Sequence, residues 1–288
     1  MHRAFTGGKV RLFADDTGIF IHDTDFNSFI AKATLQLENL FSWCSDNKLI
    51  VNSDKTCFIV FHAKNKPSYA NINSIQVCGK KIARVTSTKY LGITFDDRLS
   101  WNTHVDNICR SLMKYFGIFN HIKAFINKRL VRQLYFAFIY SRISYGIEIF
   151  GNSSTANLSR MQVIQNKLLK LVLEMDRMTP TNSLHVNLHL LKVSDIFKVN
   201  TIVFVNNSLL KLCPRNFNDY FTTYMNNYNL RNTGLRVPYA RTVIGSQSVK
   251  VQGARLWNDL PDFIKQFRYQ KNFKKHIVKY FIEQYRNE

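Results

Sequence analysis

The sequence predicts an α+β fold for its first hundred residues, followed by a mostly helical and basic remainder. Residues 1–100 mix short apolar runs of strand length with one long amphipathic helix pattern. From residue 101 on, apolar residues recur mainly at helical spacing. Such a change is typical of separate domains, and Thr179-Pro180-Thr181 interrupts the second part. We therefore expect three regions, 1–100, 101–178 and 179–288.

The composition points to a polyanionic partner. The chain has 288 residues, of which 45% are hydrophobic, and it carries 40 Lys and Arg against 19 Asp and Glu, a net charge of +21. Such an excess repels itself, so nucleic acid is the expected partner ahead of a membrane surface. The five cysteines are scattered without zinc-site or disulfide spacing. With no apolar run of spanning length, we expect a protein of the nucleus or cytoplasm that is not secreted and binds no membrane.

The elements of the first region follow from local patterns. Residues 10–22 predict two short strands around Asp15 and Asp16, with Thr17-Gly18 helping the turn. A helical pattern then runs from Phe26 to Cys44, with Thr24 or Asp25 placed to cap its start. Two strands and a hairpin are expected after it: a strand at 57–62, a hairpin at 74–85 turning at Gly79-Lys80, and a strand at 89–95.

The later regions are basic over long stretches. Residues 107–147 and 220–258 contain no acidic residue, whereas ordinary solvated surfaces mix both signs, so both stretches predict contact with a phosphate backbone. The secondary structure expected here is two or three helices in 107–147, helices at 157–173 and 184–212, an irregular segment at 220–258, and a basic helix at the end. Aromatics within 265–285 fit either base stacking or helix packing.

Asp15 and Asp16 raise the question of what two adjacent carboxylates do at a hairpin tip. Carboxylates are the ligands that Mg²⁺ prefers, together with substrate phosphates, and paired ions catalyse phosphoryl transfer. An acid pocket and a solvated turn are the alternatives, and the residue types alone leave the question open. For the second pair, Asp96-Asp97, we favour capping at a strand-to-helix junction. We expect His104 to be packed or to cap a helix, and Trp257 to anchor the core.

Four segments, in order along the chain, resemble one protein family. Phe13-Ala14-Asp15-Asp16 is similar to the [FY]-A-D-D box of reverse transcriptases. The later segments resemble parts of non-LTR (LINE-type, jockey-like) retrotransposon enzymes. "KLIVNSDKT" (48–56) resembles the sequence that follows the box, and "KYLGI" (89–93) with "LSWNTHVDNI" (99–108) resembles the primer-grip strand and the start of the thumb. "LWNDLP" (256–261) resembles a C-terminal segment.

The resemblance implies roles for individual residues. Regions 1–100 and 101–178 would be the C-terminal part of a palm and a thumb-like domain of an RNA-directed DNA polymerase. Asp15 and Asp16 would bind Mg²⁺ or Mn²⁺, and Lys55 would lie at the phosphates of the nucleotide. Contacts to the template–primer of RNA and DNA are expected from the remaining candidates: Phe13, Ala14, Gly92, Arg110, Lys114, Lys128, Arg129 and Arg132.

The family also has a third aspartate, on a strand upstream of the box, and upstream fingers. The printed chain begins 14 residues before Asp15, so we expect it to hold the metal weakly and not to polymerise alone. An upstream palm and fingers segment of the same element is then a possible partner. The alternatives are a non-catalytic module that binds RNA or a template–primer backbone, and a phosphoacceptor-type acid pocket, against which the hairpins of 57–95 argue.

Overall fold

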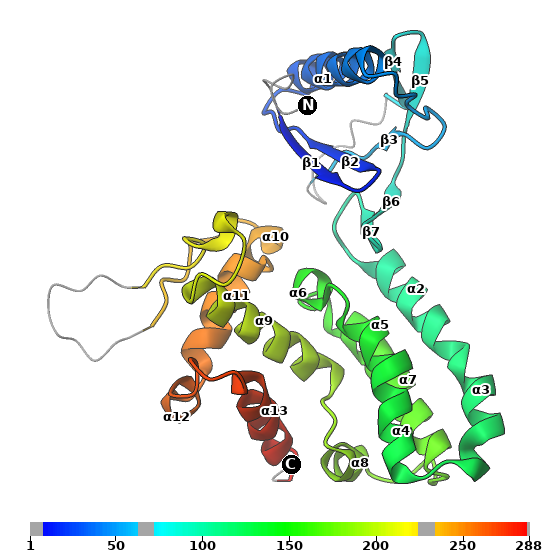
Figure 1. Cartoon of the computed structure of the whole chain (residues 1–288), viewed down its shortest axis with the longest axis vertical. Helices are drawn as coiled ribbons and strands as arrows, with labels where there is room; N and C mark the ends of the chain where they lie inside the picture. The colour runs from blue at the N-terminus through cyan, green and yellow to red at the C-terminus, as the bar shows by residue number, and fades with distance from the viewer. Residues whose placement is uncertain (1–7, 63–71, 224–233, 287–288) are drawn as a thin grey trace, which may run out of the picture. The chain divides into compact units, whose positions relative to one another are not determined.

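The computed structural model describes residues 8–62, 72–223 and 234–286, and the chain divides into two compact units, residues 1–103 and 104–288 (Figure 1). In the part described, every strand of a paired ladder belongs to the first unit, and helices dominate the second. The predicted mixed α+β class is thus confirmed. Across the same ranges, no helix is both long and apolar enough to cross a membrane.

In the described part of the first unit there are three small sheets and one long helix. The largest sheet has the order β3-β5-β4, with β3 parallel and β4 antiparallel to β5. Two separate antiparallel hairpins, β1-β2 and β6-β7, complete the strands. The bounds are β1 (Lys9–Phe13), β2 (Asp16–Phe20), α1 (Phe26–Asp46), β3 (Cys57–Phe58), β4 (Ser74–Val77), β5 (Lys80–Arg84), β6 (Ser87–Tyr90) and β7 (Ile93–Asp96).

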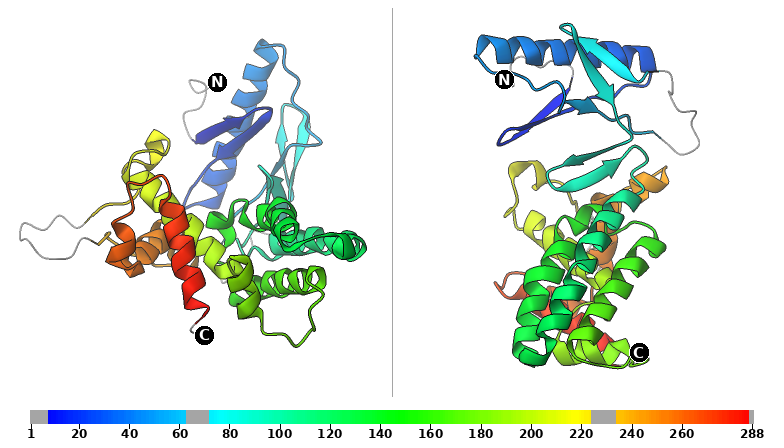
Figure 2. Two further views of the ribbon diagram at one scale, coloured as in Figure 1. Left: turned by 60° about the horizontal axis from the view of Figure 1, so that its bottom comes forward. Right: turned by 90° about the vertical axis from the view of Figure 1, so that its right-hand side faces the viewer.

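Helix α1 lies along one face of the three-stranded sheet, as both figures of the whole chain show (Figures 1 and 2). The Asp25 carboxylate accepts a hydrogen bond of 2.7 Å from the Ser28 amide, which satisfies one of the donors that a helix start leaves unpaired. The predicted helix and its cap at Asp25 are confirmed. Helix and sheet share one apolar core: Ala33, Phe41, Ile75, Val77 and Ile82.

The predictions for the other strands were only partly right. The strand expected at 57–62 is limited to Cys57–Phe58. The single strand expected at 89–95 is a hairpin, because Leu91 and Gly92 adopt φ values of +47° and +81°, the left-handed pair that a two-residue hairpin turn requires. The 74–85 hairpin turns at Cys78-Gly79 for the same reason, one residue earlier than expected.

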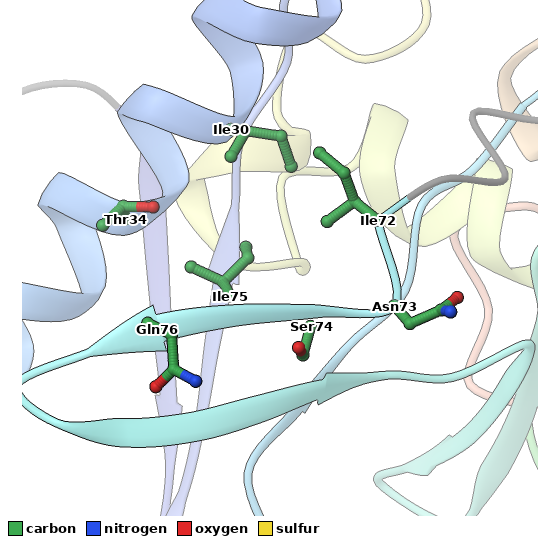
Figure 3. Close-up of a pocket in the computed structure, with 7 residues that line it drawn as sticks. All are labelled: Ile30, Thr34, Ile72, Asn73, Ser74, Ile75 and Gln76. Carbon is green, nitrogen blue, oxygen red and sulfur yellow. The ribbon is translucent and has the colours of Figure 1, made fainter.

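A pocket of about 460 Å³ opens between α1 and strand β4 (Figure 3). Its walls carry isoleucine, hydroxyl and amide side chains and no charged one: Ile30, Thr34, Ile72, Asn73, Ser74, Ile75 and Gln76. A site for phosphate or metal needs charged or converging polar groups, so this pocket offers no support for the chemistry predicted at Asp15 and Asp16.

The second unit is a set of helices around α9 (Val193–Leu209). In Figure 1, α9 lies with α11 and α13 on one side and with α5, α6 and α7 on the other. Its helices in chain order, with α2 starting just before the division, are α2 (Asn102–Met113), α3 (Tyr115–Ile122), η2 (Lys123–Phe125), α4 (Lys128–Leu134), the π-helix η3 (Tyr135–Tyr140), α5 (Ser141–Ser144), α6 (Ile147–Phe150), α7 (Thr155–Val172), α8 (Thr181–Leu188), α9, η4 (Arg215–Phe217), α10 (Val243–Ser246), α11 (Val249–Asp259), α12 (Asp262–Lys265) and α13 (Phe273–Gln284).

A buried polar network ties α7 to the segment between α8 and α9. The Gln165 amide nitrogen donates to Tyr135 Oη at 2.7 Å and to the Leu191 carbonyl at 2.9 Å. His185 is fully buried, with Nδ1 3.3 Å from the Leu190 carbonyl and Nε2 3.1 Å from Asn166 Oδ1. Burial lowers the pKa of His185 to about 4 and raises that of Tyr135. Both groups therefore stay uncharged near neutral pH.

Several helix predictions need correction in this unit. The helix expected at 184–212 is two helices, because His189 adopts φ +51° at the end of α8 and the chain restarts at Val193. The segment 220–258, expected to be irregular, contains α10 and α11 in its described part; Arg231 lies outside the described residues. The terminal helix is likewise interrupted between α12 and α13. The helix at 157–173 is confirmed as α7.

Candidate active site

Asp15 and Asp16 lie at the tip of the β1-β2 hairpin. Phe13 pairs with Asp16, so Ala14 and Asp15 form the two-residue turn. Ala14 adopts φ +50°, a left-handed conformation that costs an L-residue roughly 1 kcal/mol. Thr17 and Gly18 lie in strand β2 and not in the turn, contrary to expectation. Both aspartates are exposed, as Phe13 and Ala14 are.

A second hairpin packs against the strand that follows the aspartates. Tyr90, in the "KYLG" segment at the end of β6, lies edge-on to Phe20 with the ring centroids 6.3 Å apart. A Cβ placed on Gly18 would lie 3.0 Å from Tyr90 Oη, so the absence of a side chain at Gly18 allows the close approach. The contact brings together two segments about seventy residues apart and links the acidic tip to the Leu91-Gly92 turn. Gly18 and Tyr90 were not among the predicted site residues.

The Leu91-Gly92 turn offers a purely structural reason for a glycine at position 92. Its φ of +81° falls in the region that L side chains rarely adopt, and the residue is exposed. A close approach to a primer strand, which the resemblance implies, remains a prediction beside this explanation.

Lys55 is presented by a short ordered loop between α1 and β3. The Asn52 side-chain oxygen accepts hydrogen bonds from the amides of Asp54 (3.1 Å) and Lys55 (3.2 Å). The Thr56 hydroxyl donates to the Asn52 carbonyl at 2.8 Å. The asparagine and threonine of the "NSDKT" segment therefore shape the backbone, which leaves the Lys55 side chain exposed to solvent.

The predicted nucleic-acid residues of the second unit fall into two places. Arg110 is exposed in the last turn of α2, and Lys114 follows four residues later, also exposed. Arg129 and Arg132 are exposed on α4 and line one pocket with Gln133 and Phe136. The side chain of Lys128 lies outside the described residues. Gln133 and Phe136 were missed by the sequence analysis, although the spacing of Arg132 and Phe136 places them on one helix face.

Hydrogen bonds or burial indicate the structural role of three other residues, Asp96, His104 and Trp257. Asp96 accepts hydrogen bonds from the backbone amides of Ser100 and Trp101, both at 2.8 Å, and from that of Arg98 at 3.2 Å, so it orders the junction before α2. His104 is buried, its pKa lowered by burial, 4.6 Å from the Phe150 ring. Trp257 is only 2% exposed. As expected, Asp96 caps the strand-to-helix junction, and His104 and Trp257 are packed in the core.

A complete metal centre is not found in the residues described: among them, no group of three or more His, Cys, Asp or Glu side chains comes together. Two adjacent exposed carboxylates provide part of a Mg²⁺ coordination shell, which prefers oxygen ligands and keeps several waters or substrate oxygens. Carboxylates are suitable ligands for Mg²⁺, but two of them do not fill its coordination shell, so further ligands are required.

Comparison with known proteins gives a consistent set of relatives. The probable RNA-directed DNA polymerase from transposon BS of Drosophila melanogaster is 27% identical over 187 residues, which cover 64% of this chain. The chain is similar to RNA-directed DNA polymerases of non-LTR retrotransposons. Those from mobile element jockey (20% over 164 residues) and from transposon X-element (26% over 159 residues), of the same species, cover 56% and 53% of the chain.

The matched part of these polymerases is small. The aligned residues span 20% of the BS polymerase, 18% of the jockey polymerase and 17% of the X-element polymerase. The chain therefore corresponds to about a fifth of the length of its curated relatives. No protein-family model matches it, and no solved structure matches it.

Proposed function

We propose that this chain is a C-terminal part of an RNA-directed DNA polymerase from a non-LTR retrotransposon. Residues 1–100 would supply part of the palm, 101–178 a helical thumb and 179–288 a basic C-terminal region. The observation that carries the proposal is the Gly18–Tyr90 contact, which holds the acidic hairpin against the hairpin of the "KYLG" segment. The sequence similarity to retrotransposon polymerases supports it.

The acidic tip would bind the metal of the reaction. The carboxylates of Asp15 and Asp16 would hold Mg²⁺ or Mn²⁺, and the metal would supply charge stabilisation for nucleotidyl transfer. Lys55, exposed on its ordered loop, donates a proton to the departing pyrophosphate. Phe13, Ala14 and Gly92 border the end of the primer.

The second unit would hold the RNA and DNA of the template–primer. Arg110, Lys114, Arg129 and Arg132 are exposed cations in an acid-free stretch of sequence. Lys128 lies in the same stretch of sequence. Cations on such a stretch bind phosphates by releasing counterions, so binding is expected to weaken steeply with salt.

We propose that polymerisation requires a further segment of the same element, from the upstream palm and fingers. In the described residues, Asp15 and Asp16 have no third acidic partner, and β1 and β2 pair only with each other. Leu12, Phe13 and Phe20 on this hairpin are 48%, 64% and 49% exposed. A two-stranded hairpin with uncovered apolar residues is marginally stable in isolation and gains from a third strand.

The test measures primer extension on an RNA template with Mg²⁺ and with Mn²⁺, for the purified chain and for a longer polymerase that contains it. We expect no extension by the chain alone. In the longer protein, Asp15→Asn or Asp16→Asn should reduce extension at least about 100-fold, whereas Asp46→Asn, an exposed acid at the end of α1, should not. Extension by the chain alone would contradict the need for a further segment. Extension that survives Asp15→Asn would contradict the metal site.

The second candidate function is a non-catalytic module that binds RNA or a template–primer backbone. The net charge of +21 favours it. In that case binding by the chain alone would be salt-dependent, and Asp15→Asn would leave extension by the longer protein unchanged.

A further inference from the structure

A row of cations and aromatic rings crosses the second unit from α4 through η3 to α13. The Arg132 guanidinium lies 5.0 Å from the Phe136 ring centroid, and the Phe136 and Tyr140 rings are 5.1 Å apart. Tyr140 Oη is 3.5 Å from Lys274 Nζ on α13. The four residues form a continuous row, which we call the cation–aromatic row, over segments more than 130 residues apart.

The Arg132 end of the row opens into a pocket of about 490 Å³, lined by Arg129, Arg132, Gln133 and Phe136. Arg132 Nε donates to the Leu188 carbonyl at 3.1 Å, which fixes the guanidinium and uses one of its five N–H groups. Phe136 is 36% exposed beside it. The pocket therefore combines guanidinium and amide donors with an accessible aromatic ring.

Phe136 lies on the outward side of the π-helical turn η3. In η3, Tyr135 and Ile139 are 2% and 1% exposed and pack into the unit, whereas Phe136 remains at the surface. A π-helix is a rare and less stable backbone form that is found frequently at functional sites. At the other end of the row, Lys274 Nζ donates to Asn200 Oδ1 at 3.1 Å, so this cation is also held in place.

We infer that the cation–aromatic row binds single-stranded nucleic acid. A base would stack on the Phe136 ring, and the phosphates on either side would meet Arg132 and Lys274. Sequence-tolerant single-strand sites combine cations that follow the backbone with rings that stack on bases. In a duplex the base faces are covered by neighbouring pairs, so a ring of this kind selects unpaired strands. The inference rests on the proposed nucleic-acid contact of this unit and adds the kind of strand.

Phe138 provides a matched control for Phe136. Both are phenylalanines of η3, and their exposed fractions are 40% and 36%. Phe138 packs beside Tyr115, with ring centroids 5.3 Å apart, and the row contacts do not include it. Phe136→Leu therefore removes a phenyl ring from the cation–aromatic row, and Phe138→Leu removes a phenyl ring from a neighbouring position outside the row.

The experiment measures fluorescence anisotropy of the whole chain with labelled 12-nucleotide single strands of RNA and DNA and with a duplex of the same sequence. Phe136→Leu should weaken single-strand binding at least about fivefold, the lower end of what one stacked base contributes. Phe138→Leu should change it less than about twofold, and duplex binding should stay unchanged in both variants. Aromatic rings and cations contact the bases and phosphates that RNA and DNA have in common. Phe136→Leu should therefore weaken binding of both the RNA and the DNA single strand.

Lys274→Gln keeps the test decisive if Phe136→Leu lowers the melting temperature. It should reduce the slope of log affinity against log salt for the single strand by about 0.7, the value for one phosphate contact. Equal effects of Phe136→Leu and Phe138→Leu would overturn the row as a stacking site, and so would equal losses for duplex and single strand. If Phe136→Leu has no effect while Arg129→Gln weakens duplex binding, the row fails and the proposed backbone contact stands. Absence of binding to every probe would overturn both.

Discussion

The core of the second unit and the acidic hairpin of the first unit differ in how far their apolar side chains are buried. In the second unit, Phe150, Leu168 and Ile202 are at most 1% exposed, and the buried Gln165 amide nitrogen has two hydrogen-bond partners. In the first unit, the hairpin that carries the acidic pair leaves Phe13 64% exposed. Tight packing of apolar side chains stabilises a fold, so the core of the second unit should contribute more to stability than the exposed side chains of the hairpin. In the proposal above, a further segment of the element would cover this part of the hairpin.

The largest predicted effect on stability comes from replacing phenylalanine by alanine, which should act very differently in the two units. Phe150→Ala removes a fully buried ring and should lower the free energy of unfolding by about 3–5 kcal/mol. Phe13→Ala removes an exposed ring and should change it by no more than about 0.5 kcal/mol. Urea unfolding followed by far-ultraviolet circular dichroism measures both. A comparable loss for Phe13→Ala would mean that the hairpin is already packed in solution and would break the comparison.

A second difference concerns pH, because the polar network of the second unit holds a neutral histidine. The pKa of His185 is about 4, lowered mainly by burial, whereas a histidine in the unfolded chain titrates near 6.5. Between these values the unfolded state binds the additional proton. The contribution of His185 is therefore complete above about pH 6.5 and is lost as pH falls towards 4, by on the order of 3 kcal/mol.

The measurement is the urea midpoint at several pH values between 7 and 4. His185→Gln should flatten this dependence, while His121→Gln, at an exposed position, should leave it as in the parent chain. An unchanged slope in His185→Gln would show that another group causes the acid sensitivity.

The smallest predicted effect tests a contact between the acidic hairpin and the β6-β7 hairpin. Gly18→Ala places a Cβ 3.0 Å from Tyr90 Oη, which should cost about 1–2 kcal/mol or displace the hairpin. The ring carbon Cζ of Tyr90 would lie 3.1 Å from the same Cβ, so Tyr90→Ala, which removes the whole ring, should recover most of the loss in the double variant. Thermal unfolding of the two single variants and the double variant measures the coupling between them. Additive losses would mean that Gly18 and Tyr90 do not meet.

The site was only partly predictable. Asp15, Asp16 and Lys55 could be proposed because motifs and chemistry pointed to them, and the hairpin around the aspartates is confirmed. The Gly18–Tyr90 contact could not, since nothing local in "DTGIF" or "KYLG" indicates that the two meet. The row from Arg132 to Lys274 was missed for the same reason: its two ends are joined by the packing of distant helices.

The sequence by itself determined the mixed class, the long helix with its Asp25 cap, the acidic hairpin and the helix α7, because periodicity and capping act over a few residues. Only the tertiary structure decided where strands end and how "KYLGITF" turns, since left-handed residues such as Leu91 carry a conformational cost that surrounding contacts must offset. It also decided which aromatic rings are buried. Tyr135 and Phe136 are neighbours in the same apolar run, and their different exposure follows from the packing of η3 against the rest of the second unit.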